Sequence, residues 1–224
     1  MRPLAWMCLV AVWCVWPCPA ATAAEAPPVS ATRLLKWEVL ARHGEAGMVG
    51  AEVTAGYVES RRAGIACLRL TFSGPVDPTT LGVGALSIRG QLGGDLSDMV
   101  AGMSLQGGDT VLVVQLAEAL DDGDRYSLSL GDQVRGVAGT GIGGTRRCEA
   151  AALVGDTDGS GRVDYADVAA LRMAAAGAGG ALVHRCDVDG NGRLDQADED
   201  AITARSGRTL PPRPKVAGDQ KTEN

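Results

Sequence analysis

A twelve-residue segment occurs twice in the C-terminal third of the chain, at 156–167 and again at 187–198. The first copy reads D-T-D-G-S-G-R-V-D-Y-A-D and the second reads D-V-D-G-N-G-R-L-D-Q-A-D. Both place oxygen-bearing side chains at positions 1, 3, 5, 9 and 12 and a glycine at position 6. This is the ligand spacing of an EF-hand-type calcium loop, in which the carbonyl of position 7 is a further ligand. Because the four aspartates of each copy repel one another without a cation, the repeat favours two loops that each fold around a divalent metal ion.

We predict that these loops bind two Ca²⁺ ions. Oxygen ligands in this number favour Ca²⁺ over zinc or copper, and over Mg²⁺, which takes fewer protein ligands. The alternative is a pair of solvated Asp/Gly-rich turns, but two copies in the same register are hard to obtain by chance. The predicted ligands are the backbone carbonyl of position 7 and the side chains of positions 1, 3, 5, 9 and 12. Position 9 is expected to act through water. They are Asp156, Asp158, Ser160, Arg162, Asp164 and Asp167 in the first loop, and Asp187, Asp189, Asn191, Arg193, Asp195 and Asp198 in the second.

A helical pattern follows each loop. Residues 165–176 are rich in alanine and end at Gly177, and residues 196–205 form a shorter candidate that ends at Gly207. No amphipathic helical pattern precedes the first loop. A loop followed by an exit helix, twice, with Asp instead of Glu at position 12, resembles the type I duplicated repeat of the dockerin family. The resemblance covers roughly residues 150–210, which are expected to form a small α domain of two calcium loop–helix repeats.

The resemblance implies a non-catalytic docking role. Dockerins bind cohesin modules on a scaffold or cell-surface protein, need calcium to fold, and usually belong to polysaccharide-degrading assemblies. The family's partner-contacting pair lies at loop positions 10 and 11, which are Tyr165-Ala166 and Gln196-Ala197 here. In the best-known type I dockerins these are Ser/Thr pairs, and the two repeats match closely enough to allow two binding orientations. For docking in a single orientation, Tyr165 is the better anchor, because buried aromatic side chains often dominate interface energy.

The N-terminus predicts export. Arg2 precedes an apolar run at 4–16 and small residues at 20–24, which is typical of a secretory signal peptide. The run is too short and wrongly flanked for a transmembrane helix. We therefore predict a signal peptide at 1–24, no membrane span, and a secreted, extracellular or cell-surface location.

Cysteine content and charge add two expectations for the mature chain. Cys67, Cys148 and Cys186 remain after cleavage. Export permits one disulfide, but three cysteines leave one over, and the sequence leaves the pairing open. Loss of Arg2 changes the formal net charge from −6 to −7, and this acidic balance argues against nucleic acid as a partner.

A short linker at 25–33 leads to a second predicted domain at 34–149. Apolar and polar residues alternate there with period two, and glycine, aspartate and proline separate the alternating stretches. This pattern predicts an antiparallel β-sandwich. The alternating stretches are 36–41, 68–73, 85–89, 112–116 and 126–130.

Part of this domain resembles a bacterial Ig-like domain of surface-layer and adhesin proteins. The resemblance implies a spacer, adhesion or carbohydrate-contact role and brings no catalytic residues. The matching pieces are Leu68–Ser73, Pro75–Pro78, Thr110–Leu116, Asp121–Gly123, Tyr126–Leu130 and Val137–Gly139.

Motifs for catalysis are weak, and we predict that the chain is not an enzyme. Residues 139–144 match G-x-G-x-x-G, but no βαβ unit surrounds them. The only histidines, His43 and His184, lie beside no nucleophile motif and are interpreted as a turn residue and a connecting residue. The Pro-rich, then polar segment 211–224 is predicted to be a disordered tail. The alternative function is a stand-alone extracellular structural or adhesion module that calcium stabilises without a cohesin partner.

Overall fold

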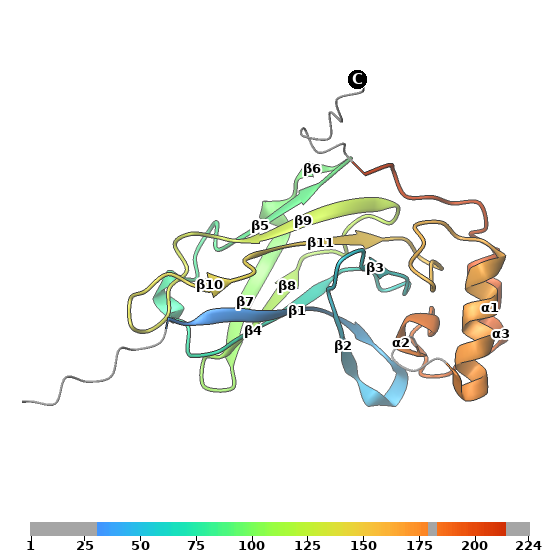
Figure 1. Cartoon of the computed structure of the whole chain (residues 1–224), viewed down its shortest axis with the longest axis horizontal. Coiled ribbons are helices and arrows are strands. Elements are labelled where there is room, and N and C mark those ends of the chain that lie inside the picture. Colours follow the sequence, from blue (N-terminus) through green and yellow to red (C-terminus); the bar gives the residue numbers. More distant parts are fainter. Residues whose placement is uncertain (1–30, 179–182, 214–224) are drawn as a thin grey trace, which may run out of the picture.

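A computed structural model describes residues 31–178 and 183–213 of the chain. The described part is mostly β, with two sheets and a few short helices near its C-terminal end (Figure 1). The predicted signal peptide 1–24, most of the linker and residues 214–224 lie outside the described residues. No described helix is long and apolar enough to cross a membrane.

The first sheet has the strand order β10-β1-β4-β8-β7, and β2 pairs with the same strand β1. All pairs are antiparallel except β1 with β10, which is parallel. The predicted stretches at 36–41, 68–73 and 112–116 fall on three of its strands. The strands are β1 (Arg33–Arg42), β2 (Met48–Glu52), β4 (Cys67–Phe72), β7 (Val100–Gln106), β8 (Val111–Leu116) and β10 (Gly143–Gly144).

The second sheet has the order β3-β11-β9-β5-β6. Its strands are β3 (Val58–Glu59), β5 (Leu86–Gly90), β6 (Gly94–Asp95), β9 (Asp124–Leu130) and β11 (Arg147–Ala152). The pair β3 and β11 is parallel. The predicted antiparallel sheets are therefore mixed at one edge each: the two-residue strands β3 and β10 each add in parallel to a strand distant in sequence, which no local pattern signals.

The two sheets pack over one shared hydrophobic core. Alternate residues of the strands point into it, for example Leu68 and Leu70 from the first sheet and Ile88 and Leu128 from the second. Trp37 is also buried there, and its indole Nε1 donates to the carbonyl of Thr145 at 2.9 Å. Trp37 is thus a core residue.

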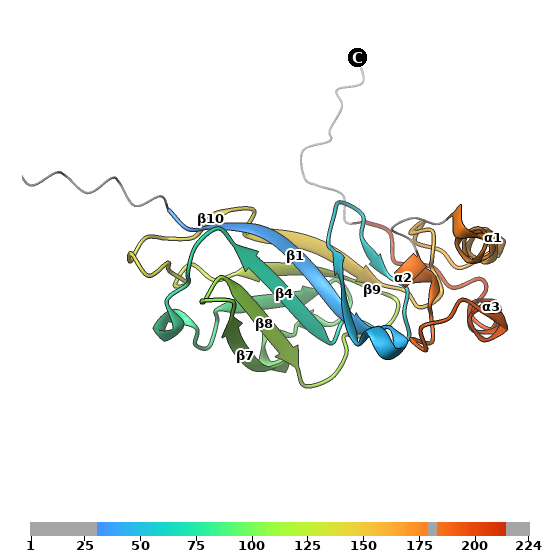
Figure 2. The same ribbon diagram turned by 90° about the horizontal axis from the view of Figure 1, so that it is seen from below.

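The helices lie at one end of the sheets (Figures 1 and 2). The two predicted exit helices begin at Tyr165 and Gln196, as the sequence indicated, and lie side by side in both views. Gly177, the predicted end of the first, has a left-handed φ of 84°. The helices are α1 (Tyr165–Met173), α2 (Val183–Cys186) and α3 (Gln196–Thr203), the π-helical turn is η4 (Ala174–Ala178), and the 3-10 turns are η1 (Gly44–Ala46), η2 (Pro78–Thr80) and η3 (Ser97–Met99).

The β part and the C-terminal part are continuous. Strand β11 runs to Ala152, so the boundary predicted between 149 and 150 falls inside a strand. A second hydrophobic core includes Val58 and Ala151 from the strands together with Leu171 and Ile202 from the helices. We call residues 31–152 the β unit and residues 153–210 the loop–helix unit, and the second core joins them.

Cys67, Cys148 and Cys186 are free thiols. Cys67 lies on β4 of the first sheet, Cys148 on β11 of the second, and Cys186 in the second core. Burial raises the pKa of the Cys186 thiol to about 11. The disulfide that export permitted is therefore absent among the described residues, because the fold places the three thiols in different layers.

Candidate metal centres

Both predicted loops bring three carboxylates together. Carboxylate oxygens of Asp156, Asp158 and Asp167 lie within 4.8 Å of one another. Asp187, Asp189 and Asp198 repeat this arrangement in the second loop, within the same distance. These are loop positions 1, 3 and 12 in each copy, so the structure brings together the first, third and last predicted ligands of each loop.

Backbone hydrogen bonds fix the carboxylate of position 1 in the same way in both loops. Asp156 accepts from the amides of Gly159 and Gly161 at 2.9 and 2.8 Å. Asp187 accepts from Gly190 and Gly192 at 3.1 and 3.0 Å. The position-6 glycines have φ of 83° and 87°, a left-handed conformation that makes this turn possible and that other residues rarely adopt.

The carboxylate of position 12 closes each loop onto its helix. Asp167 accepts from the amides of Asp158 and Asp164 at 3.1 and 2.8 Å. Asp198 accepts from Asp189 and Asp195 at 3.2 and 3.1 Å. Position 12 is therefore both a member of the acidic triad and half of a capping box at the start of the helix.

The remaining predicted ligands lie around the triads. The Ser160 hydroxyl donates to the carbonyl of Arg162 at 3.1 Å, and the Asn191 side chain accepts from the Arg193 amide at 2.7 Å. Positions 5 and 7 are thus neighbours in both loops.

Position 9 has a different place. Asp164 and Asp195 cap α1 and α3 by accepting from Ala166 and Ala197 at 2.8 and 2.9 Å. Neither belongs to a triad. The structure gives both residues a capping role, and their role as water-mediated ligands stays a prediction.

Burial makes the triads electrostatically strained. Asp156, Asp167, Asp187 and Asp198 are fully buried, at 0% exposure. Burial, with repulsion from the carboxylates of Asp167 and Asp158, raises the pKa of Asp156 to about 7. Burial also raises the pKa of Asp167 and that of Asp198. Without a cation, these buried carboxylates resist ionisation because burial and mutual repulsion both disfavour the charged form. A hard divalent cation bound among the oxygens would offset the burial cost and the repulsion together.

This pKa predicts a pH-dependent calcium affinity for the first loop. Below about pH 7 a proton occupies Asp156 in the metal-free fold and must leave before the cation binds. Protons therefore stabilise the metal-free fold as the pH falls, whereas calcium requires the ionised carboxylate. We expect the first loop to bind calcium about tenfold more weakly at pH 6 than at pH 8. Calorimetric titration of the Asp187→Ala variant, which leaves the first loop alone, measures this, and an affinity independent of pH would contradict it.

The four predicted partner-contacting residues are all solvent-exposed. Tyr165 and Ala166 form the first turn of α1, and Gln196 and Ala197 form the first turn of α3. Tyr165 is 73% exposed, which is unusual for an aromatic side chain. These residues are therefore accessible to a partner.

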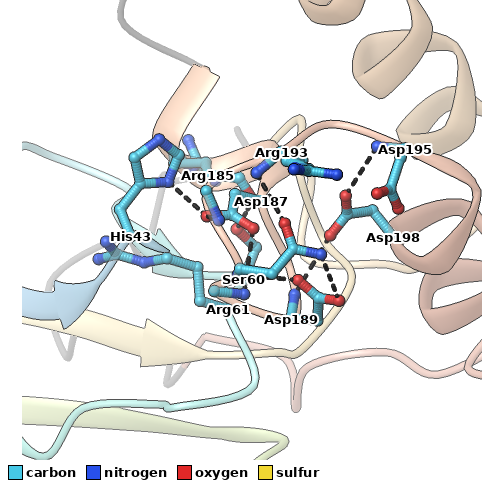
Figure 3. Close-up of polar contacts among 12 residues, drawn as sticks. His43, Ser60, Arg61, Arg185, Asp187, Asp189, Arg193, Asp195 and Asp198 are labelled. Carbon is cyan, nitrogen blue, oxygen red and sulfur yellow. Dashed lines mark hydrogen bonds and ion pairs between the residues drawn. The ribbon is translucent and has the colours of Figure 1, made fainter. Parts of the chain in front are cut away.

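The structure also shows a contact that the sequence did not signal. The second loop packs on the turn between β1 and β2, where the Gly44 amide donates to the Gly190 carbonyl at 2.9 Å. A side chain on Gly44 would place its Cβ 2.5 Å from the carbonyl oxygen of Asn191, so only glycine fits. The His43 imidazole lies against the carboxylate of Asp187, as Figure 3 shows. The interpretation of His43 as a simple turn residue missed this role.

Further contacts hold the second loop and the helix α2 that precedes it. The Arg62 amide donates to the Val188 carbonyl at 2.7 Å, and the Ser60 hydroxyl to the Arg185 carbonyl at 2.7 Å. The rings of His43 and His184 meet edge to face, with centroids 4.8 Å apart. The candidate site is thus a pair of acidic loops, of which the second is held directly by the β unit.

Comparisons with known proteins are limited to partial structural similarity. No family model matches the chain, and no curated protein matches it. A crystal structure of the S-layer protein rSbsC is similar over 39% of this chain and 12% of that chain, with 21% identity and a TM-score of 0.33. The N-terminal part of the bacterial S-layer protein SbsC covers 55% of this chain and 24% of its own, with 17% identity and a TM-score of 0.35. Domains 1-6 of the surface layer protein SbsC cover 55% of this chain and 14% of their own, with 15% identity and a TM-score of 0.36. The chain thus spans less than a quarter of the length of each of these structures.

Proposed function

We propose that the chain is an exported, non-catalytic module that binds two Ca²⁺ ions and docks onto a protein partner through the exposed starts of α1 and α3. The observation that carries the calcium assignment is the same triad of loop positions 1, 3 and 12 in both copies. Neighbouring oxygen donors at positions 5 and 7 extend each triad toward the six or more ligands that Ca²⁺ prefers.

Calorimetric titration with calcium tests this assignment. The protein lacking residues 1–24 should bind two ions per chain after removal of metal with a chelator. Zero or one site would overturn the proposal for the loops. Magnesium at the same concentration should bind more weakly, because it requires a tighter octahedral ligand set.

We assign the loop–helix unit to a dockerin-like role with a cohesin-type partner. The type I repeat pattern in the sequence and the exposure of Tyr165, Ala166, Gln196 and Ala197 support this assignment. The second loop contacts the β unit on one side, whereas the starts of both helices are exposed. A calcium-dependent pull-down from the secretome of the source organism, followed by a direct binding assay with each captured protein that carries a cohesin-like domain, tests the partner class.

Substitution of Tyr165 should show which of the two repeats contributes more to partner binding. We expect Tyr165→Ala to weaken binding of a cohesin-type partner at least about tenfold, because an exposed aromatic that becomes buried contributes strongly to an interface. Gln196→Ala, at the equivalent position of the second repeat, should change binding little. Surface plasmon resonance with both variants measures this, and both should still bind two calcium ions. Equal losses from the two variants would show that both repeats engage the partner.

We propose an Ig-like spacer role for the β unit. Besides two sheets on one core, it has a feature typical of Ig-like domains: the hydroxyl of Tyr126, near the start of β9, donates to the carbonyl of Asp121 at 2.6 Å. Such a tyrosine corner fastens the connection that enters a strand.

A stand-alone structural module is the second candidate. The observation that favours it is the tight contact between the second loop and the β1–β2 turn, through which calcium would fasten the two units together. In that case neither Tyr165→Ala nor Gln196→Ala would affect any partner, while calcium removal would still destabilise the whole chain.

A further inference from the structure

A cavity of about 560 Å³ lies against the second sheet, and its lining residue Arg125 reaches Gly161 of the first loop. This volume is within the range of small-molecule sites, roughly 300–1,000 Å³. Four arginines line the cavity, with one carboxylate, that of Glu149, among the lining residues. The arginines are Arg89 on β5, Arg125 on β9, Arg147 on β11 and Arg213 in the segment that follows the loop–helix unit.

Strand register places three of these arginines on one face of the sheet. Arg89 and Glu149 both pair with Ser127, so these three form one row across the sheet. Arg125 lies two residues before Ser127 on β9, and Arg147 pairs with Ser129, two residues after it. Residues two apart share a face, so the arginines occupy three consecutive rows of the surface opposite the core.

The C-terminal segment completes the cavity. The guanidinium Nε of Arg125 donates to the Pro211 carbonyl, and the Gln91 amide donates to the Pro212 carbonyl, both at 2.9 Å. These bonds hold Arg213 at the edge of the cavity. The first residues of the predicted disordered tail, Pro211–Arg213, are thus ordered against the β unit, because their carbonyls find side-chain donors there.

The positive charges of the cavity are poorly compensated. Within residues 31–178 and 183–213, no carboxylate forms an ion pair with Arg125, Arg147 or Arg213. Arg89 has a partner in Asp95, at 3.9 Å and largely exposed. Burial, together with repulsion from Arg213, lowers the pKa of Arg125, although attraction to the carboxylates of Glu149 and Asp156 opposes this shift. In a chain with a formal net charge of −6, this gathering of positive charges attracts anions to one face of the second sheet.

The geometry points to this cavity as a binding site for an organic anion that carries carboxylate or sulfate groups, such as an acidic oligosaccharide. Guanidinium groups bind planar carboxylate and sulfate oxygens through paired hydrogen bonds. Tyr57, Tyr126 and Ala150 also border the cavity but belong to the hydrophobic core. The cavity is larger than a lone inorganic anion needs, and its size fits an organic anion.

Calorimetry with three probes tests the site in the calcium-loaded protein lacking residues 1–24. The probes are tri-galacturonic acid, a sulfated chondroitin disaccharide and neutral maltotriose, each at low ionic strength. We expect at least one acidic probe to bind, with an affinity that falls as salt is added, and maltotriose not to bind. Binding of galacturonate alone or of the sulfated probe alone identifies the charged group. Binding of maltotriose as tight as the acidic probes, or no binding of either acidic probe, would overturn the inference.

A pair of double variants localises the binding. Arg89→Gln with Arg147→Gln removes two charges from the cavity and should weaken the acidic probe at least about tenfold. Arg33→Gln with Arg135→Gln removes the same charge from exposed arginines outside the cavity and should leave the affinity within about twofold. Equal losses in both would mean nonspecific attraction and would refute the site. Both double variants should still bind two calcium ions, so this result is independent of the proposed calcium function.

Discussion

Replacement of the position-1 aspartates should remove the calcium sites one at a time. We expect Asp156→Ala to abolish binding at the first loop and Asp187→Ala at the second, each with at least about a hundredfold loss of affinity. Each carboxylate is fully buried and anchors its loop through two glycine amides, so no other side chain can replace it. Calorimetric titration should count one remaining site in each variant and none in the double variant.

A matched control uses a carboxylate outside the triads. Asp200 is exposed on α3 and accepts a hydrogen bond from the Gln196 side chain. Asp200→Ala changes the net charge equally and should retain both sites. The assignment of the triads would be wrong if Asp156→Ala or Asp187→Ala kept two sites, or if Asp200→Ala lost one.

Calcium removal should also destabilise both units together. Without the cation, four fully buried aspartates either stay ionised at high energy or take up protons, and the loops lose their stability. Because Val58 and Ala151 belong to the second core, loss of the loop–helix unit exposes part of the β unit. A chelator should reduce helical circular dichroism and lower the melting temperature reported by Trp37 fluorescence. Unchanged values of both would contradict this coupling.

Loss of Glu59 should destabilise the chain by about 3–5 kcal/mol, because it leaves a buried arginine without its partner. Glu59 and Arg61 are both about 1% exposed. The Glu59 carboxylate accepts from the Arg61 guanidinium at 2.7 and 2.6 Å and from the Tyr57 hydroxyl at 2.7 Å. Glu59→Ala keeps the arginine but removes every one of these bonds.

Urea denaturation of the calcium-loaded protein measures the effect. Glu118→Ala, which removes an exposed carboxylate, is the control and should leave the midpoint nearly unchanged. The double variant Glu59→Met with Arg61→Met should be more stable than Glu59→Ala, since it removes both buried charges. A Glu59→Ala midpoint equal to that of the control would show that this pair contributes little.

The sequence predicted those features that depend on residues close together in the chain. The triads form because positions 1, 3 and 12 lie within twelve residues, and the loop backbone folds them together through its own amides. The starts of α1 and α3 follow from the same loops, because Asp164 and Asp195 cap them. Alternation identified β1, β4, β5, β8 and β9, since inward residues of a two-sheet unit must be apolar.

The tertiary structure alone decided how distant segments meet. The parallel strands β3 and β10 have two residues each, too few for any periodicity, and their pairing depends on strands far away in the sequence. The predicted boundary between 149 and 150 divided strand β11. Residues Ala150–Ala152 show no alternation of apolar and polar residues, because all three are buried. Tertiary packing between distant segments also produces the contact of Gly44 with the second loop. It likewise brings together the arginines of three strands and of the C-terminal segment. Local spacing determines an acidic triad formed within twelve residues, whereas strand pairing and surface cavities result from long-range packing that no local pattern records.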